Sequence, residues 1–149
     1  MIKMPRIDDS IEIKATPATV FQYISDLEAL PEWVKWWKDV DVTSLSKRGI
    51  GTTDAARLQV GPQKQNVEAL TTEFKDGEFY TRKLTRGMTL TERVAVVPFG
   101  DGSKVAYIVD YTPPMGPLGK VGDLLFMERL FQQLMGDTLA NLKARFEGR

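Results

Sequence analysis

Cysteine and histidine are both absent from this sequence of 149 residues. The lack of cysteine excludes disulfides, thiolate metal sites and cysteine nucleophiles. The lack of histidine excludes a Ser-His-Asp triad, histidine-ligated zinc or iron, and the side chain that ordinarily exchanges protons near pH 7. Any acid-base chemistry would therefore depend on Glu, Asp, Tyr, Lys or Arg side chains with shifted pKa values. We accordingly expect no metal and no other cofactor.

The sequence also lacks an excess of charge, a long hydrophobic run and any familiar catalytic motif. Its 20 basic and 20 acidic residues cancel, so no overall field attracts nucleic acid or anionic lipid. No apolar run approaches the roughly 18 residues of a membrane span, and the N-terminus has no signal-peptide core. There is no phosphate-binding loop, G-x-S-x-G motif, dinucleotide fingerprint or metal-ligand spacing. We therefore expect a cytoplasmic protein with no nucleic-acid partner and no integral membrane segment.

The longest regular pattern in the chain lies at residues 118–147, where apolar residues recur at three- and four-residue steps. This spacing is typical of one stripe of an α-helix about 45 Å long, which needs a broad apolar surface to cover it. The stripe consists of Val121, Leu124, Leu125, Phe131, Met135, Leu139, Leu142 and Phe146. Glu128 falls inside the stripe, with Gln132 one turn further on. Either both face a cavity and orient the polar head of a ligand, or Glu128 reaches solvent at the edge of the stripe.

The same helix has a second apolar set outside this stripe, which is unusual for a surface helix. Either loops of the protein cover this face, or it marks a cavity mouth, a membrane-touching lip, or a contact with a second copy or another protein. The segment 113–122, rich in Pro and Gly, is a candidate gate beside it. The second set consists of Phe126, Met127, Leu130 and Leu134.

The order of the predicted elements indicates an α+β domain over residues 1–149. A strand over 6–15 is followed by a helix beginning at Pro17 and a second short helix over 27–34, interrupted at Pro31. The period then changes to two, which predicts six strands over 39–46, 52–60, 65–75, 79–85, 89–97 and 104–111. Strands in one run, with helices at the two ends, are typical of the α+β class. A twisted antiparallel sheet of about seven strands curls, so its concave face would wrap the long helix and leave a cavity where the two separate.

Five segments of the sequence carry a family resemblance, namely 16–21 (TPATVF), 26–33 (DLEALPEW), 51–52 (GT), 101–105 (DGSKV) and 113–118 (PPMGPL). Together they resemble the START/Bet v 1-like (SRPBCC) superfamily, which includes START lipid-transfer domains, the birch-pollen allergen fold and polyketide cyclase/dehydrase-like proteins. The resemblance spans the whole chain and is nearest to the polyketide cyclase-like branch. It implies a helix-grip fold with a hydrophobic cavity between the sheet and the long helix. These segments shape the scaffold and carry no chemistry, so the resemblance is specific for fold alone.

Polar residues on predicted strands are candidates for chemistry in such a cavity. Arg82 shares a strand face with Tyr80, and Glu92 shares one with Val94. A three-residue turn at 86–88 would pair Arg82 with Glu92 and permit a buried ion pair, whereas a two-residue turn would place them on opposite faces. A solvated pair on the surface is the simpler alternative.

Aromatic residues complete the candidate site. Trp33, Trp36 and Trp37 lie close together, and they either pack the short helices onto the sheet or provide one wall of a pocket. Tyr107 and Tyr111 fall on the apolar face of the last strand, where each hydroxyl would contact a ligand or a backbone group. The candidate ligand-binding residues are Trp33, Trp37, Tyr80, Arg82, Glu92, Tyr107, Tyr111, Glu128, Phe131, Gln132 and Met135.

Three functional hypotheses follow from these features. The first is a protein that binds, and by extension transports, a hydrophobic small molecule such as a lipid, isoprenoid or polyketide. The second is a metal-independent polyketide cyclase or dehydratase, in which Glu128, Glu92, Arg82 and Tyr107 position the substrate and transfer protons. The third is a protein-interaction module that uses the second apolar face of the long helix. The absence of catalytic motifs favours the first, non-enzymatic hypothesis.

Overall fold

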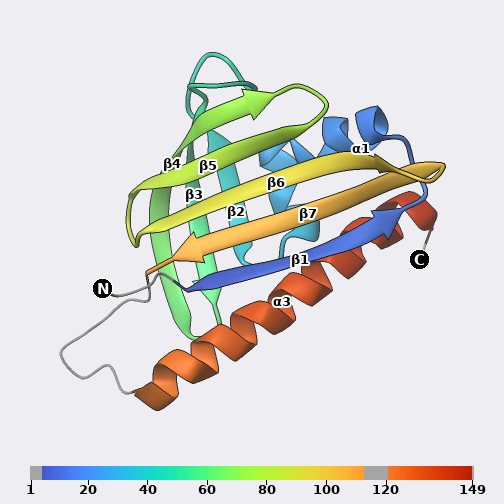
Figure 1. The fold of residues 1–149 in the computed structure, drawn as a ribbon. Helices are drawn as coiled ribbons and strands as arrows, with labels where there is room; N and C mark the ends of the chain where they lie inside the picture. Colours follow the sequence, from blue (N-terminus) through green and yellow to red (C-terminus); the bar gives the residue numbers. More distant parts are fainter. Residues whose placement is uncertain (1–4, 113–120, 149) are drawn as a thin grey trace.

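A computed structural model describes residues 5–112 and 121–148, which form a curled antiparallel sheet and a long C-terminal helix (Figure 1). The elements in chain order are β1 (Arg6–Ile13), α1 (Pro17–Ile24), the short 3-10 helix η1 (Leu27–Ala29), α2 (Leu30–Trp33), β2 (Trp37–Val42), β3 (Thr53–Val60), β4 (Gln63–Lys75), β5 (Phe79–Arg86), β6 (Leu90–Phe99), β7 (Gly102–Tyr111) and α3 (Val121–Glu147).

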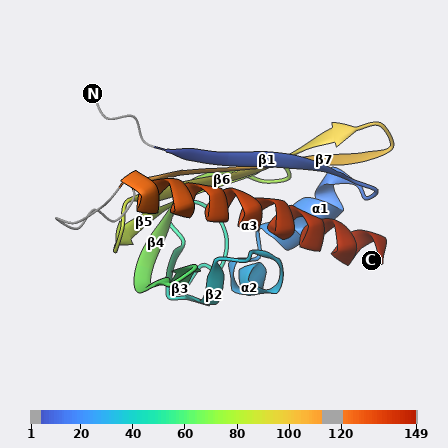
Figure 2. The same ribbon diagram turned by 90° about the horizontal axis from the view of Figure 1, so that it is seen from below.

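The sheet has the strand order β1-β7-β6-β5-β4-β3-β2, and every neighbouring pair is antiparallel. Viewed from below, β1 lies on one side of α3 and β2 and β3 on the other, so the curled sheet grips the helix (Figure 2). The short helices α1 and α2 close the remaining side near the C-terminal half of α3 (Figure 2). This arrangement confirms the predicted α+β helix-grip fold.

The local sequence accounts for the short helices. The Thr16 side chain accepts a hydrogen bond from the Thr19 amide, and Pro17 occupies the first helical position of α1. Pro31 lies in the first turn of α2, so the predicted second helix divides into η1 and α2 at Leu30.

Strand boundaries differ from the prediction by a few residues. The largest difference is in β2, which was predicted to continue to residue 46 but ends at Val42, because its ladder with β3 ends at the pair Val42 and Asp54. Strand β6 continues past Pro98 to Phe99 because the β6–β7 hairpin ladder extends to the pair Phe99 and Gly102. The ladder between β5 and β6 ends at Ala95, so Pro98 has no β5 residue opposite it and costs the sheet no hydrogen bond there.

Of the stripe residues of α3 whose side chains the structure describes, Phe131, Met135, Leu139 and Leu142 are buried and Phe146 is partly buried, whereas Leu125 is 51% exposed. The prediction for Leu125 was therefore wrong, because the first turns of α3 project beyond the sheet (Figure 1). Residues 113–120, with most of the expected gate, and the side chains of 121–124 lie outside the described residues.

The polar face of α3 covers the edge strand β1. The Gln132 side-chain amide donates to the carbonyl oxygen of Asp8 at 3.1 Å, and Lys143 Nζ donates to that of Glu12 at 2.7 Å. These contacts satisfy carbonyl groups that an edge strand would otherwise leave to solvent or to another chain. Gln132 itself is exposed. It holds the helix to the sheet edge and does not face the interior.

Candidate functional site

The interior of the sheet contains a buried charged cluster centred on Arg82 of β5. Buried side chains alternate with more exposed ones along β3 and β6, and this alternation turns Asp54 and Glu92 inward. In β5 the three consecutive residues Tyr80, Thr81 and Arg82 are all buried. Arg82 lies directly opposite Glu92 in the β5–β6 ladder. The side chains of all three residues are fully buried.

The Arg82 guanidinium bridges three strands. Its Nε and one Nη donate to the two carboxylate oxygens of Asp54 at 2.8 and 2.6 Å, which is a bidentate pair, and the other Nη donates to Glu92 at 2.7 Å. To reach Asp54, Arg82 crosses β4, where the residues opposite Asp54 and Arg82 are Ala69 and Thr71. These small side chains leave room for the guanidinium above the sheet.

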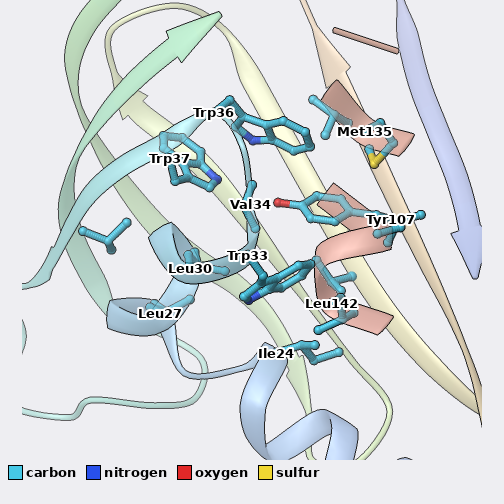
Figure 3. Close-up of a cluster of buried hydrophobic side chains, with 14 of the residues drawn as sticks. Ile24, Leu27, Leu30, Trp33, Val34, Trp36, Trp37, Tyr107, Met135 and Leu142 are labelled. Carbon is cyan, nitrogen blue, oxygen red and sulfur yellow. The ribbon is translucent and has the colours of Figure 1, made fainter. Parts of the chain in front are cut away.

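Two aromatic residues complete the cluster on the side of Glu92. One Glu92 carboxylate oxygen accepts hydrogen bonds from the Trp37 indole nitrogen at 3.1 Å and from the Tyr107 hydroxyl at 2.6 Å. Figure 3 shows this hydroxyl directed toward the Trp37 indole. The Arg82 guanidinium also lies 4.4 Å from the centre of the Trp37 ring, a favourable cation–π distance. The two carboxylates together accept five hydrogen bonds from protein donors.

Burial and the carboxylates shift the pKa values of the surrounding groups. Burial alone would lower the pKa of Arg82, but the hydrogen bonds and negative charges of Asp54 and Glu92 outweigh it and raise that pKa above its usual range. Burial, with the charge of Glu92 added, raises the pKa of Tyr80 and that of Tyr107 well above the ordinary value for tyrosine. Arg82 is therefore permanently charged, and both tyrosine hydroxyls stay protonated.

Three buried polar groups have no hydrogen-bond partner among the described residues. They are the indole nitrogens of Trp33 and Trp36 and the hydroxyl of Tyr80. Such a group costs about 1–3 kcal/mol when nothing satisfies it, and native proteins contain few of them. Tyr80 lies near the charged cluster, since Glu92, Arg82 and Asp54 all act on its pKa. The aromatic rings of Trp33 and Trp36 both contact Tyr107.

An apolar pocket lies between the sheet and the N-terminal half of α3. Its cavity volume is only about 10 Å³, which is room for about one water molecule. The pocket is lined by Leu58, Val60, Gln63, Gln65, Met88, Tyr111, Met127 and Phe131. An unbroken series of ring contacts leads from it toward the cluster, with centroid distances of 5.2 Å for Tyr111–Phe131, 4.9 Å for Phe131–Trp36 and 5.2 Å for Trp36–Tyr107.

The structure brings most of the predicted site residues together. Trp37, Arg82, Glu92 and Tyr107 meet in the charged cluster, with Tyr80 beside it. The alternative of a solvated Arg82–Glu92 pair is thereby excluded. Tyr111 and Phe131 line the pocket, whereas Trp33 and Met135 belong to the buried hydrophobic core (Figure 3).

Two predicted residues of α3 lie elsewhere. Glu128 is exposed, so it reaches solvent at the edge of the apolar stripe and does not face a cavity. Its charge still acts on Tyr111, whose pKa rises to about 12 mainly through burial. Gln132 is also exposed and binds the edge strand as described above.

The second apolar face of α3 is mostly covered by the protein itself. Met127, Leu130 and Leu134 are partly buried against the core, and only Phe126 is largely exposed, at 62%. Leu130 packs against the β3–β4 turn at Gly61, where a Cβ atom would lie 2.6 Å from its Cδ2. Of these residues, Met127 lines the pocket between the sheet and α3.

Sequence reasoning missed Asp54, the second carboxylate partner of Arg82. The signal was present, because Asp54 alternates with the inward residues Ala56, Leu58 and Val60 on the same strand. A charged residue in register with three buried apolar residues predicts a buried charge that needs a partner.

Among the side chains that the structure describes, in residues 5–112 and 125–148, there is no group of three or more acidic residues placed to hold a metal ion. None of the helices in this part of the chain is both long and apolar enough to cross a membrane.

Solved structures of other proteins share the fold. A protein from Thermus thermophilus has a TM-score of 0.78 at 21% identity, over 97% of this chain and 98% of its own. A START superfamily protein from Mycobacterium smegmatis has a TM-score of 0.74 at 16% identity, over 96% and 97% of the two chains. The Zhui aromatase/cyclase from a Streptomyces species has a TM-score of 0.74 at 9% identity, over 98% and 95%. At these identities the likeness shows the fold alone.

Sequence comparison gives the family. No curated protein matches the chain significantly. Residues 4–147, nearly the whole chain, match the family described as polyketide cyclase / dehydrase and lipid transport. The chain therefore belongs to this family.

Proposed function

We propose that this protein binds a hydrophobic small molecule, such as a lipid, isoprenoid or polyketide, between the concave face of the sheet and α3. The observation that carries the proposal is the apolar pocket under the N-terminal half of α3, where strand and helix side chains meet without packing completely. The family description, which names lipid transport, and the aromatase/cyclase among the similar structures support this kind of ligand.

The pocket must enlarge to accept such a ligand, and its lining suits that change. Met88 and Met127 are unbranched and flexible, so they can vacate space by changing rotamer at low cost. Phe131 separates the pocket from Trp36, and rotation of its ring would extend the cavity toward the charged cluster. Gln63 and Gln65 provide polar groups at the same pocket.

Ligand binding is tested first on the protein as purified. Organic extraction and native mass spectrometry should reveal a bound hydrophobic molecule, and the neutral fluorophore N-phenyl-1-naphthylamine should bind with saturable fluorescence. An extract without ligand, together with no saturable binding of the fluorophore, would refute the proposal.

A pair of matched variants locates the binding site. Val60→Phe fills the pocket and should weaken fluorophore binding about tenfold or more, because the added ring occupies the space that the ligand needs. Val97→Phe makes the same change at an exposed position of β6 and should leave binding unchanged. The thermal midpoint of both variants is measured alongside, and equal binding by both folded variants would place the ligand elsewhere.

A cyclase or dehydratase activity is the second candidate, and one observation favours it. The Glu92 carboxylate is buried beside the Tyr107 hydroxyl, as a proton-transferring pair would require. We rank it second because both carboxylate oxygens of Glu92 already accept hydrogen bonds from protein donors. Incubation with a linear poly-β-ketone should then yield a cyclised product with loss of water, and Glu92→Gln should abolish this turnover while fluorophore binding persists. Equal turnover by this variant would exclude Glu92 as the base.

A further inference from the structure

We propose that the polar group of the bound ligand is a neutral hydrogen-bond acceptor, such as a ketone or ester carbonyl, and that the site discriminates against carboxylates and phosphates. This inference rests on the proposed ligand-binding function and names the chemical class that the same site selects. Two independent observations carry it: the unpaired polar groups of the interior, and the balance of its charges.

The unpaired groups are chiefly hydrogen-bond donors. An indole nitrogen can only donate, so Trp33 and Trp36 each offer a donor with no acceptor among the described residues. Tyr80 offers a hydroxyl that burial keeps protonated. An acceptor oxygen on the ligand would satisfy such a group, whereas an alkyl chain would leave it unsatisfied.

These donors lie along the path by which the pocket would extend. Phe131 lines the pocket and contacts Trp36, and Trp36 contacts the Tyr107 ring. The Tyr107 hydroxyl belongs to the charged cluster, and Tyr80 lies in the same row of the sheet as Tyr107, on the other side of Val94. A ligand whose apolar part fills the pocket would therefore direct its inner end toward the unpaired donors.

The charges of the interior disfavour an anion at that position. Among the described residues, Asp54, Arg82 and Glu92 are the only buried charged residues, and they leave one formal negative charge in excess. Every nitrogen of the Arg82 guanidinium is already hydrogen-bonded to a carboxylate. An anionic head would lose its water, meet an excess of negative charge and find no uncommitted cation.

The test compares two ligands of equal chain length, 2-dodecanone and dodecanoate, at a pH where the acid is ionised. Each is titrated against N-phenyl-1-naphthylamine bound to the full chain. The ketone should displace the fluorophore at a concentration at least about tenfold lower than dodecanoate, because the ionised group is disfavoured in a buried, uncompensated position. Glu92→Gln removes the excess negative charge and should narrow this difference.

A hydroxyl deletion tests the donors. Tyr80→Phe removes only the unpaired hydroxyl and should weaken ketone binding about fivefold, the effect of one neutral hydrogen bond. Tyr23→Phe is the matched control, since the Tyr23 hydroxyl is bound to Glu32 on the surface. It should bind the ketone as the unmodified protein does.

The outcomes separate this inference from the function on which it rests. If neither ligand displaces the fluorophore and extraction yields nothing, hydrophobic ligand binding itself fails. If dodecanoate binds as tightly as the ketone, the inference is overturned while ligand binding stands. Unchanged ketone binding by Tyr80→Phe would likewise overturn it, because that hydroxyl would then be satisfied by buried water alone.

Discussion

The residue that most needs an explanation is Arg82, because a fully buried guanidinium contributes to stability only when it is completely paired. Removing an arginine and two carboxylates from water costs several kcal/mol per ion, and well-packed apolar residues often stabilise a core as much. The cluster is therefore better explained by the strand register that it selects than by a gain in stability. Arg82 binds β3 and β6 from β5, so the correct register of three strands is the one that satisfies all its bonds.

Substitution of Arg82 tests this account. Arg82→Met keeps the approximate volume but leaves Asp54 and Glu92 buried without their cation, which should lower the free energy of unfolding by about 3–5 kcal/mol. Arg57→Met is the control, because Arg57 pairs with Asp39 in an exposed position and its loss should change stability little. Equilibrium unfolding in urea gives both values. A loss below about 1 kcal/mol for Arg82→Met would show that the carboxylates do not depend on this arginine.

For single residues, the sequence predicted several members of the buried cluster but not which of them contact one another. Arg82 and Glu92 were both identified, but their pairing depended on the length of one turn, and a difference of one residue reverses the face of every side chain. Asp54 contacts Arg82 diagonally across β4, and no local pattern indicates such a partner. Glu128 could not be placed, because the helical phase alone does not show where the sheet stops covering α3.

Among the elements, the helix α3 and the β3–β4 turn determine the shape of the pocket. Helix and strand periods predicted both elements, since periodicity directly reflects one-sided burial. The exposure of Leu125 was not predicted, because it depends on how far the sheet extends beneath α3. The contact between Leu130 and Gly61 brings the turn against the helix beside the pocket residues Val60 and Met127.

A glycine comparison measures this contact between elements. Gly61 and Gly100 both lie in turns with φ near +58° and +57°, but a Cβ at Gly61 meets Leu130, whereas at Gly100 there is nothing within 4 Å. Each Ala substitution should cost about 1 kcal/mol for the left-handed backbone, and Gly61→Ala should cost about 1 kcal/mol more from overpacking.

The control for the steric part is the double variant Gly61→Ala with Leu130→Ala. Removing the Leu130 side chain should abolish the additional cost, giving a coupling energy of about 1 kcal/mol in a double-mutant cycle measured by thermal unfolding. Equal losses for Gly61→Ala and Gly100→Ala would mean that Leu130 turns away freely and that the turn and α3 are not coupled.

For the molecule as a whole, the aromatic interior determines how stability depends on pH, because histidine is absent and all four tyrosines have raised pKa values. Burial is the largest cause in each case. In the unfolded chain a tyrosine ionises near pH 10. Stability from these groups is therefore fully present below about pH 10 and is lost as the pH rises from there toward the higher values of the folded protein.

This dependence of stability on pH predicts the course of alkaline unfolding. Between about pH 10 and the folded pKa, each fully buried tyrosine should lower the free energy of unfolding by about 1.4 kcal/mol per pH unit. Tyrosinate absorbance should remain low in the folded protein above pH 10 and appear together with unfolding. Tyr80→Phe should reduce the loss of unfolding free energy above pH 10 by about 1.4 kcal/mol per pH unit. At neutral pH it should not destabilise the ligand-free protein, because the Tyr80 hydroxyl has no hydrogen-bond partner among the described residues. If Tyr80 and Tyr107 ionised near pH 10 in the folded protein with no loss of stability, burial would not raise their pKa values and this explanation would be wrong.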